Sequence, residues 1–140
     1  YPVSAVVSRE DVLGVFRPGD HGSTFGGNPL AAAVAMAALD VIVQDNLPQR
    51  SAELGRYFMD KLKTIDSPHI REVRGRGLFI GVELHPGAGG ARRFCEALAE
   101  RGLLCKETHD HVIRFAPPLV ISRDELDLAF EHVRAVLEGE

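Results

Sequence analysis

A cluster of hydrogen-bond donors at residues 21–29, with the sequence HGSTFGGNP, contains no Asp, Glu, Lys or Arg. Its three glycines allow a ligand to approach backbone N–H groups closely, and Ser23 and Thr24 add rotatable hydroxyl donors. Such donors suit an oxyanion such as a phosphate. Asn28 and Pro29 are typical of the N-cap and first position of a helix, whose dipole also favours an anion. On composition alone, a glycine-rich connection that only caps this helix is the simpler interpretation.

Arg114 is the second candidate, because it interrupts the otherwise apolar segment 112–115. In a strand, alternation places its side chain on the face opposite Ile113 and Phe115. A guanidinium held rigidly in this way can bind a carboxylate through two parallel hydrogen bonds. A solvated arginine on the outer face of a sheet is the alternative, and the local residues by themselves favour it.

Other polar residues favour structural roles. Arg74 and Arg76 alternate with glycines and could line an anionic site, but solvated or ion-paired arginines are the better interpretation. The triplet 109–111, His-Asp-His, has no third metal ligand at a suitable spacing and is expected to form a polar hairpin. His21 is interpreted as a structural hydrogen-bonding residue, and no metal site is predicted.

The lysines are informative because none has the apolar surroundings that would lower an amine pKa for catalysis. Lys61 and Lys63 lie on or beside the polar face of an amphipathic helix, and Lys106 ends a predicted strand. The sequence therefore offers no catalytic lysine.

Bulk properties limit the possible partners. The formal net charge of −4 gives no electrostatic reason to expect nucleic acid or an anionic membrane surface. The apolar run at 30–39 is too short to span a bilayer. Cys95 and Cys105 fit no C-x-x-C spacing, so a reducing, cytoplasmic setting is expected. The opening Tyr-Pro-Val-Ser has the character of the middle of a folded segment, so we expect a piece of a longer protein.

Hydrophobic periodicity predicts the elements that must position these residues. Strands are expected at 3–7, 78–84, 103–106 and 112–115. Helices are expected at 9–16, with Ser8 as its cap, at 29–43, 49–65 and 91–101, and after the capping box 122–125. The helix at 29–43 carries no charge before Asp40, which favours burial on nearly all sides by layers that so short a chain does not supply. The second half has the order strand, helix, strand, strand, helix, typical of a compact α/β or α+β unit.

Three motifs in order resemble the C-terminal part of the class III pyridoxal-phosphate-dependent aminotransferases. These motifs are HGSTFGGNPL at 21–30, VRGRGL at 73–78 and IRFAPPL at 113–119. The opening YPVSAV and the run RFAPPL resemble more narrowly the branch that transfers the δ-amino group of ornithine to 2-oxoglutarate. The acetylornithine and aminobutyrate branches match less well there. The resemblance covers essentially all 140 residues.

The resemblance implies an α/β fold of the fold-type I transferase class. Residues 1–43 would end the large cofactor domain, 44–66 would form a connecting helix, and 67–140 would form the small C-terminal α/β domain. Ser23 and Thr24 would bind the phosphate of pyridoxal 5'-phosphate in the neighbouring subunit of a homodimer. Arg114 would bind the α-carboxylate of glutamate or 2-oxoglutarate.

The same resemblance places the cofactor-binding lysine upstream of Tyr1. The aspartate that pairs with the pyridine nitrogen and the aromatic residue that stacks on the ring would lie further upstream. No catalytic residue is therefore predicted in this chain, which would act only together with the upstream half of the enzyme. Glu107, where the family usually has proline, departs from the pattern without an assigned consequence. Two alternatives stay open: a non-catalytic, carboxylate-binding or regulatory domain, and a decayed remnant.

Overall fold

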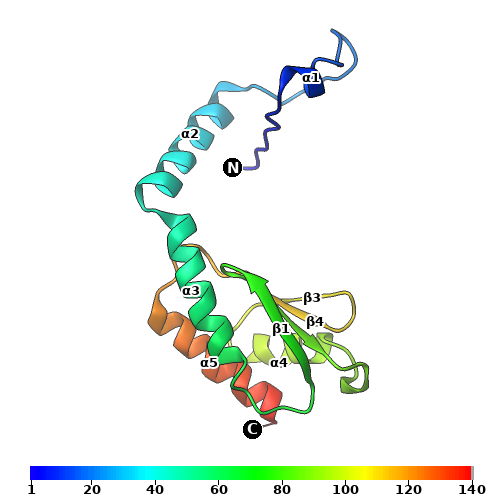
Figure 1. The fold of residues 1–140 in the computed structure, drawn as a ribbon, viewed down its shortest axis with the longest axis vertical. Coiled ribbons are helices and arrows are strands. Elements are labelled where there is room, and N and C mark those ends of the chain that lie inside the picture. The colour runs from blue at the N-terminus through cyan, green and yellow to red at the C-terminus, as the bar shows by residue number, and fades with distance from the viewer. Residues whose placement is uncertain (140) are drawn as a thin grey trace. The chain divides into compact units, whose positions relative to one another are not determined.

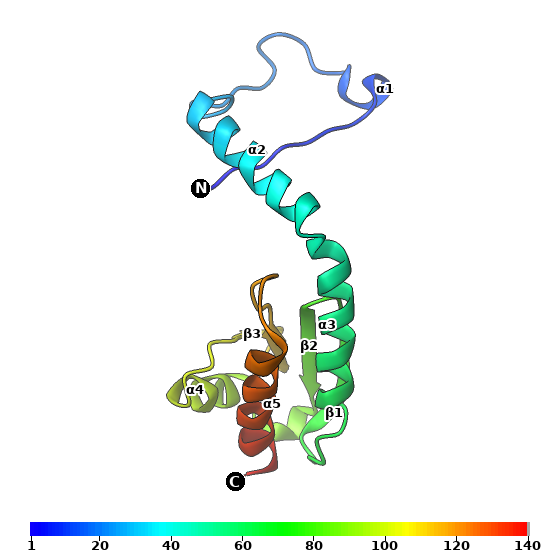
Figure 2. The same cartoon turned by 90° about the vertical axis from the view of Figure 1, so that its left-hand side faces the viewer.

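The computed structural model describes residues 1–139. These residues divide into two compact units, of which the first is Tyr1–Asp45 and the second begins at Asn46. Figure 1 and Figure 2 show the elements of both units. Within the described residues, no single helix is long and apolar enough to cross a membrane.

The first unit contains two helices, α1 (Glu10–Leu13) and α2 (Pro29–Gln44). Helix α1 is shorter than predicted, and its N-cap is Arg9 with no side-chain cap bond, so the prediction of Ser8 as the cap is wrong. The predicted strand at 3–7 is also absent, because residues 1–9 form no regular secondary structure. A strand needs a neighbour for its N–H and C=O groups, and no strand occurs among the described residues of this unit.

Helix α2 begins where the sequence predicts. Asn28 Oδ1 accepts a hydrogen bond from the Ala31 N–H at 2.8 Å, which caps the helix, and Pro29 follows as its first residue. Only Ala31 of α2 is buried, which agrees with the expectation that so short a chain does not supply the layers that would cover this helix. Leu30, Met36 and Leu39 are each 60–67% exposed, since the unit supplies no covering layer.

The second unit is a four-stranded antiparallel sheet with helices packed against one of its faces. The strands, in spatial order, are β1 (Ile70–Arg76), β2 (Phe79–Leu84), β4 (Val112–Phe115) and β3 (Lys106–Thr108). The helices are α3 (Leu47–Leu62), α4 (Arg92–Glu100), α5 (Arg123–Glu138) and the short 3-10 helix η1 (Pro86–Ala88). Figure 2 shows α3 beside β1 and β2, and α4 on the side of β3.

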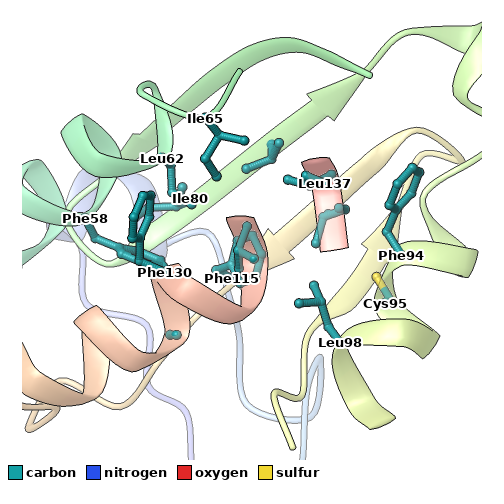
Figure 3. Close-up of a cluster of buried hydrophobic side chains, with 14 of the residues drawn as sticks. Phe58, Leu62, Ile65, Ile80, Phe94, Cys95, Leu98, Phe115, Phe130 and Leu137 are labelled. Atoms are coloured by element: carbon teal, nitrogen blue, oxygen red, sulfur yellow. The ribbon is translucent and has the colours of Figure 1, made fainter. Parts of the chain in front are cut away.

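The hydrophobic core fills the space between the helices and the inner face of the sheet (Figure 3). Alternate residues of β2 and β4, including Ile80 and Ile113, point into it and are no more than 4% exposed. The Phe58 ring on α3 meets the Phe115 ring edge to face, with centroids 6.1 Å apart. Because each fully buried large apolar side chain contributes about 1.5–3 kcal/mol, this core fixes the sheet that carries the exposed outer face.

Two glycines allow α3 to pack directly on the turn between β1 and β2. A Cβ added to Gly55 would lie 2.0 Å from the carbonyl oxygen of Gly77. Ser51 Oγ, one helical turn earlier, accepts a hydrogen bond from the Leu78 N–H at 3.1 Å. These contacts locate the start of β2 against the helix.

The predicted strand order is incomplete because β1 was not predicted. Its residues are mostly exposed, so they show no apolar alternation to signal a strand. Strand β3 begins at Lys106, later than the predicted 103–106, because Leu103 and Leu104 lie in the connection after α4. The capping box at Ser122 is confirmed.

Candidate functional site

The glycine loop has the geometry of a tight, donor-rich turn. Ser23 Oγ accepts a hydrogen bond from the Gly26 N–H at 3.0 Å, and the Asn28 side-chain amide donates to the Phe25 carbonyl at 2.7 Å. Gly27 has φ +71°, in the left-handed region that glycine adopts without penalty. Since Ser23 Oγ acts as an acceptor within the turn, its hydroxyl hydrogen is available to a ligand.

The surface of this loop is open. Ser23 and Thr24 are both exposed, and a cavity of about 390 Å³ is lined by the loop together with residues 1–4. Hydroxyl and amide donors with no carboxylate among the lining residues are a chemically suitable set for a phosphate. Ser23 lines this cavity, whereas Thr24 is exposed on the same loop but is not among the lining residues.

Arg114 projects from β4 on the outer face of the sheet, away from the helices. Its neighbours Ile113 and Phe115 are buried on the inner face, as alternation predicts. In the register of the sheet, Arg114 lies directly opposite Gly81 of β2 on one side and Lys106 of β3 on the other. The core packing of β4 thus fixes the backbone of Arg114 while its side chain stays exposed.

A cavity of about 380 Å³ lies on this outer face. Its wall includes Arg114, Arg76, Phe79, Gly81 and Thr108. The Arg114 guanidinium carbon lies 5.9 Å from the centroid of the Phe79 ring. Within the part of the chain that the structure describes, Arg114 forms no ion pair, so its charge is available to an anion.

Arg74 lines the same cavity but its charge is already compensated. It donates to Glu72 at 3.0 Å and to Glu83, which Arg71 also contacts at 2.9 Å. Hydrogen bonding from Arg74 is the main cause of a lowered Glu83 pKa, and burial of the carboxylate opposes it. The interpretation of Arg74 as an ion-paired residue is confirmed.

The structure supports the interpretation of the lysines. Lys61 donates to Asp127 at 2.7 Å and lies 4.7 Å from the Phe130 ring centroid. Its pKa is raised, chiefly by the hydrogen bond with Asp127, which is the opposite of what a catalytic amine needs. Lys106 donates to Glu107 at 2.9 Å. Glu107, the departure from the family pattern, is thus engaged in a local ion pair.

His109 and Asp110 form the tip of the predicted polar hairpin, with φ of 49° and 58°. Phe79 and Gly81 are site residues that sequence reasoning did not assign to the candidate site. What was missing was the β2–β4 register, which brings them beside Arg114. Ser23 and Thr24 belong to the first unit and Arg114 to the second, so their convergence on one centre stays a prediction.

Comparison with known proteins identifies the class. The family model "Aminotransferase class-III" matches residues 1–137, so the chain belongs to the class III aminotransferases. It is 64% identical over 139 residues to "Ornithine aminotransferase" of Geobacillus sp. (strain WCH70), a match that covers 99% of this chain and 34% of that protein. It is 65% identical over 137 residues to the protein of the same name in Exiguobacterium sp. (strain ATCC BAA-1283 / AT1b), covering 98% and 34%. The chain spans about a third of the length of these curated relatives.

Solved structures agree with this family. The ornithine δ-aminotransferase of Plasmodium falciparum matches with a TM-score of 0.89 and 37% identity, over 95% of this chain and 35% of that chain. The acetylornithine aminotransferase of Elizabethkingia anophelis matches with a TM-score of 0.86 and 38% identity, over 96% and 36%. The predicted fold class, an α/β part of a fold-type I transferase, is confirmed. The division at residues 43 and 66 into domains of a whole enzyme stays a prediction.

Proposed function

We propose that this chain supplies a cofactor-phosphate loop and a substrate-carboxylate clamp to an ornithine aminotransferase. In the proposed reaction, the δ-amino group of ornithine passes to 2-oxoglutarate, giving glutamate semialdehyde and glutamate. The observation that carries the proposal is the uncompensated Arg114 guanidinium on the wall of an open cavity. The identity of 64% with a relative named ornithine aminotransferase supports the choice of substrate.

Ser23 and Thr24 would hold the phosphate of pyridoxal 5'-phosphate. The donor set fits this group, because the hydroxyl groups of Ser23 and Thr24 are both exposed and the cavity that Ser23 lines has no carboxylate among its lining residues. When bound, the cofactor supplies the electron sink for amino transfer. The proposed contribution of this chain is to bind and orient the cofactor phosphate.

Arg114 would orient the second reactant. Its fixed strand position suits a bidentate contact with the α-carboxylate of 2-oxoglutarate or glutamate. The amine that binds the cofactor is assigned to polypeptide outside this chain, a proposal supported by the ion-paired states of Lys61 and Lys106. We further propose a homodimer, in which the loop of one subunit serves the cofactor of the other, and a reducing, cytoplasmic setting, supported by the free thiols of Cys95 and Cys105.

A chimera tests this proposal. The 140 residues replace the corresponding segment of the Geobacillus relative, and formation of glutamate semialdehyde from ornithine and 2-oxoglutarate is measured. We expect turnover by the chimera and none by the chain alone. Replacing Arg114 by Met should lower kcat/KM for 2-oxoglutarate roughly 10- to 100-fold, the loss of a charged hydrogen-bonding group. Arg134→Met, which removes an exposed arginine on α5, is the matched control and should leave activity unchanged.

The other outcomes are equally specific. Turnover by the isolated chain would refute the assignment of the amine to other polypeptide. Tight binding of 2-oxoglutarate by the chain, with an inactive chimera, would favour a non-catalytic carboxylate-binding domain. An inactive chimera without carboxylate binding would favour a decayed remnant.

A further inference from the structure

Phe79 is a large apolar side chain placed on the open face of the sheet. It is 61% exposed, whereas the next residue, Ile80, is 1% exposed on the inner face. A single exposed aromatic residue is ordinary at a protein surface, but this one forms part of the wall of the Arg114 cavity. Its ring therefore stands where a ligand of Arg114 would bind.

The register explains how the ring reaches Arg114. The residue directly opposite Arg114 on β2 is Gly81, which offers no side chain, and Phe79 is the next outward-facing residue along that strand. Such diagonal neighbours are within reach of long and aromatic side chains. The guanidinium carbon lies 5.9 Å from the ring centroid, within the distance at which a cation is attracted to an aromatic face.

Charged groups on the neighbouring strands do not compete for the guanidinium. Glu83, the acidic residue that follows Gly81 on the same face of β2, is held by Arg71 and Arg74. Glu107 on β3 is paired with Lys106. Among the described residues, the Phe79 ring is the partner that the structure gives to the Arg114 guanidinium.

We propose that Phe79 is a positioning residue that holds the Arg114 guanidinium over the cavity, ready to bind a carboxylate. The role of Phe79 in catalysis rests on the proposed function, whereas the contact between its ring and the Arg114 guanidinium does not. An exposed arginine otherwise samples many rotamers, and ordering it before binding reduces the entropy lost on binding. A cation–π contact at an exposed site corresponds to an effect of about two- to fivefold on an equilibrium constant.

The first experiment tests the contact in the 140-residue chain without any ligand. The ring should shift the Nε–H proton resonance of Arg114 through its ring current. Phe79→Leu keeps an apolar side chain and should abolish this shift, whereas Phe79→Tyr keeps a ring and should retain it. A resonance that is the same in all three proteins would overturn the proposal.

The second experiment tests the consequence in the chimera. Because ordering of Arg114 helps the bound substrate and the transition state equally, Phe79→Leu should raise KM for 2-oxoglutarate about two- to fivefold with kcat unchanged. Phe79→Tyr should restore KM. In an Arg114→Lys background, the effect of Phe79→Leu should be much smaller, since the group that it positions has gone.

The outcomes distinguish the positioning role of Phe79 from the proposed aminotransferase function. An equal effect of Phe79→Leu with and without Arg114 would overturn the positioning role, because the ring would then act on the substrate directly. A retained ring-current shift together with an inactive chimera would support the contact while refuting the proposed function.

Discussion

Arg114 and Gly81 lie directly opposite each other on the outer face of the sheet, in adjacent antiparallel strands. Because Gly81 has no side chain, the space beside the guanidinium is open and forms part of a cavity of about 380 Å³. A Cβ at this position would lie 3.2 Å from Cγ1 of Val112, which is a tight but tolerable contact. The absence of a side chain at residue 81 thus shapes the candidate carboxylate site.

The first prediction follows from this relationship. Gly81→Leu should fill the cavity and weaken binding of 2-oxoglutarate by roughly tenfold or more, which corresponds to about 1.4 kcal/mol or more. Gly81→Ala should have a much smaller effect. Calorimetric titration of both variants with 2-oxoglutarate measures the difference in affinity. Gly87→Ala is the control, because an added Cβ at that position has nothing within 4 Å. Equal affinities for all three variants would show that the ligand does not occupy this cavity.

The second prediction concerns the packing of α3 on the sheet. Helix propensity alone would make Gly55→Ala stabilising by about 1 kcal/mol. The added Cβ would instead lie 2.0 Å from the Gly77 carbonyl oxygen, so backbone must move. We expect net destabilisation of about 1–3 kcal/mol, measured by urea unfolding. Gly87→Ala is again the matched control. A Gly55→Ala variant as stable as the unmodified chain would mean that α3 does not pack this closely.

The third prediction concerns thiol reactivity. Burial raises the pKa of Cys105 from its ordinary value of 9.0 to about 12, and the neighbouring Cys95 adds to the effect. At pH 8 the thiolate fraction of Cys105 should therefore be on the order of a thousandfold lower than that of an unperturbed thiol. Alkylation of the folded chain at pH 8 should be slow, and alkylation in denaturant fast. Stability should fall above about pH 9, because the unfolded thiol then loses its proton and the folded one does not.

Sequence reasoning predicted the elements with strong apolar periodicity. The alternation at 78–84 correctly divides β2 into the buried residues Ile80, Val82 and Leu84 and an outer face with Phe79 and Gly81. The capping box at Ser122 correctly begins α5. In both cases the local pattern and the tertiary packing require the same arrangement, so a local signal is sufficient.

Elements that depend on partners were predicted less well. Strand β1 is an edge strand with charged, exposed residues, and it is defined by pairing with β2 rather than by its own pattern. Prediction of the candidate site from the sequence was limited in the same way. The type and face of Arg114 follow from the sequence, but Phe79 becomes its neighbour only through the register between strands separated by α4. No local pattern encodes that register.

The fourth prediction concerns the exposed apolar side chains of α2. Leu30, Met36 and Leu39 are 62%, 67% and 60% exposed, which favours association through this helix. The chain should sediment as oligomers or aggregates, and Met36→Lys combined with Leu39→Glu should shift it toward the monomer. Leu128→Lys replaces a leucine on α5 that is 59% exposed and is the matched control. This substitution should not shift the chain toward the monomer. A monodisperse monomer without any substitution would contradict the prediction.

The fifth prediction gives the pH dependence of the α5 capping box. Glu125 accepts hydrogen bonds from the Ser122 N–H at 2.7 Å and from the Ser122 hydroxyl at 2.8 Å. These bonds, the backbone bond first, lower the pKa of Glu125 in the folded chain. A carboxyl group with a lowered folded-state pKa stabilises the fold at pH values above its unfolded pKa, and this contribution is lost as the pH falls through the folded value.

Glu125→Gln should therefore have a lower free energy of unfolding than the unmodified chain at pH 7. This difference in free energy should shrink as the pH falls below the ordinary pKa of a glutamate side chain. Urea unfolding of both proteins between pH 7 and pH 3 measures this convergence. Glu131→Gln, on the same helix but outside the cap, should show no such pH dependence, because its exposed pair with Arg134 contributes little. A constant difference between Glu125→Gln and the unmodified chain at every pH would mean that the carboxylate charge is irrelevant to the cap. The stabilisation would then come from hydrogen-bond geometry that the amide reproduces only in part.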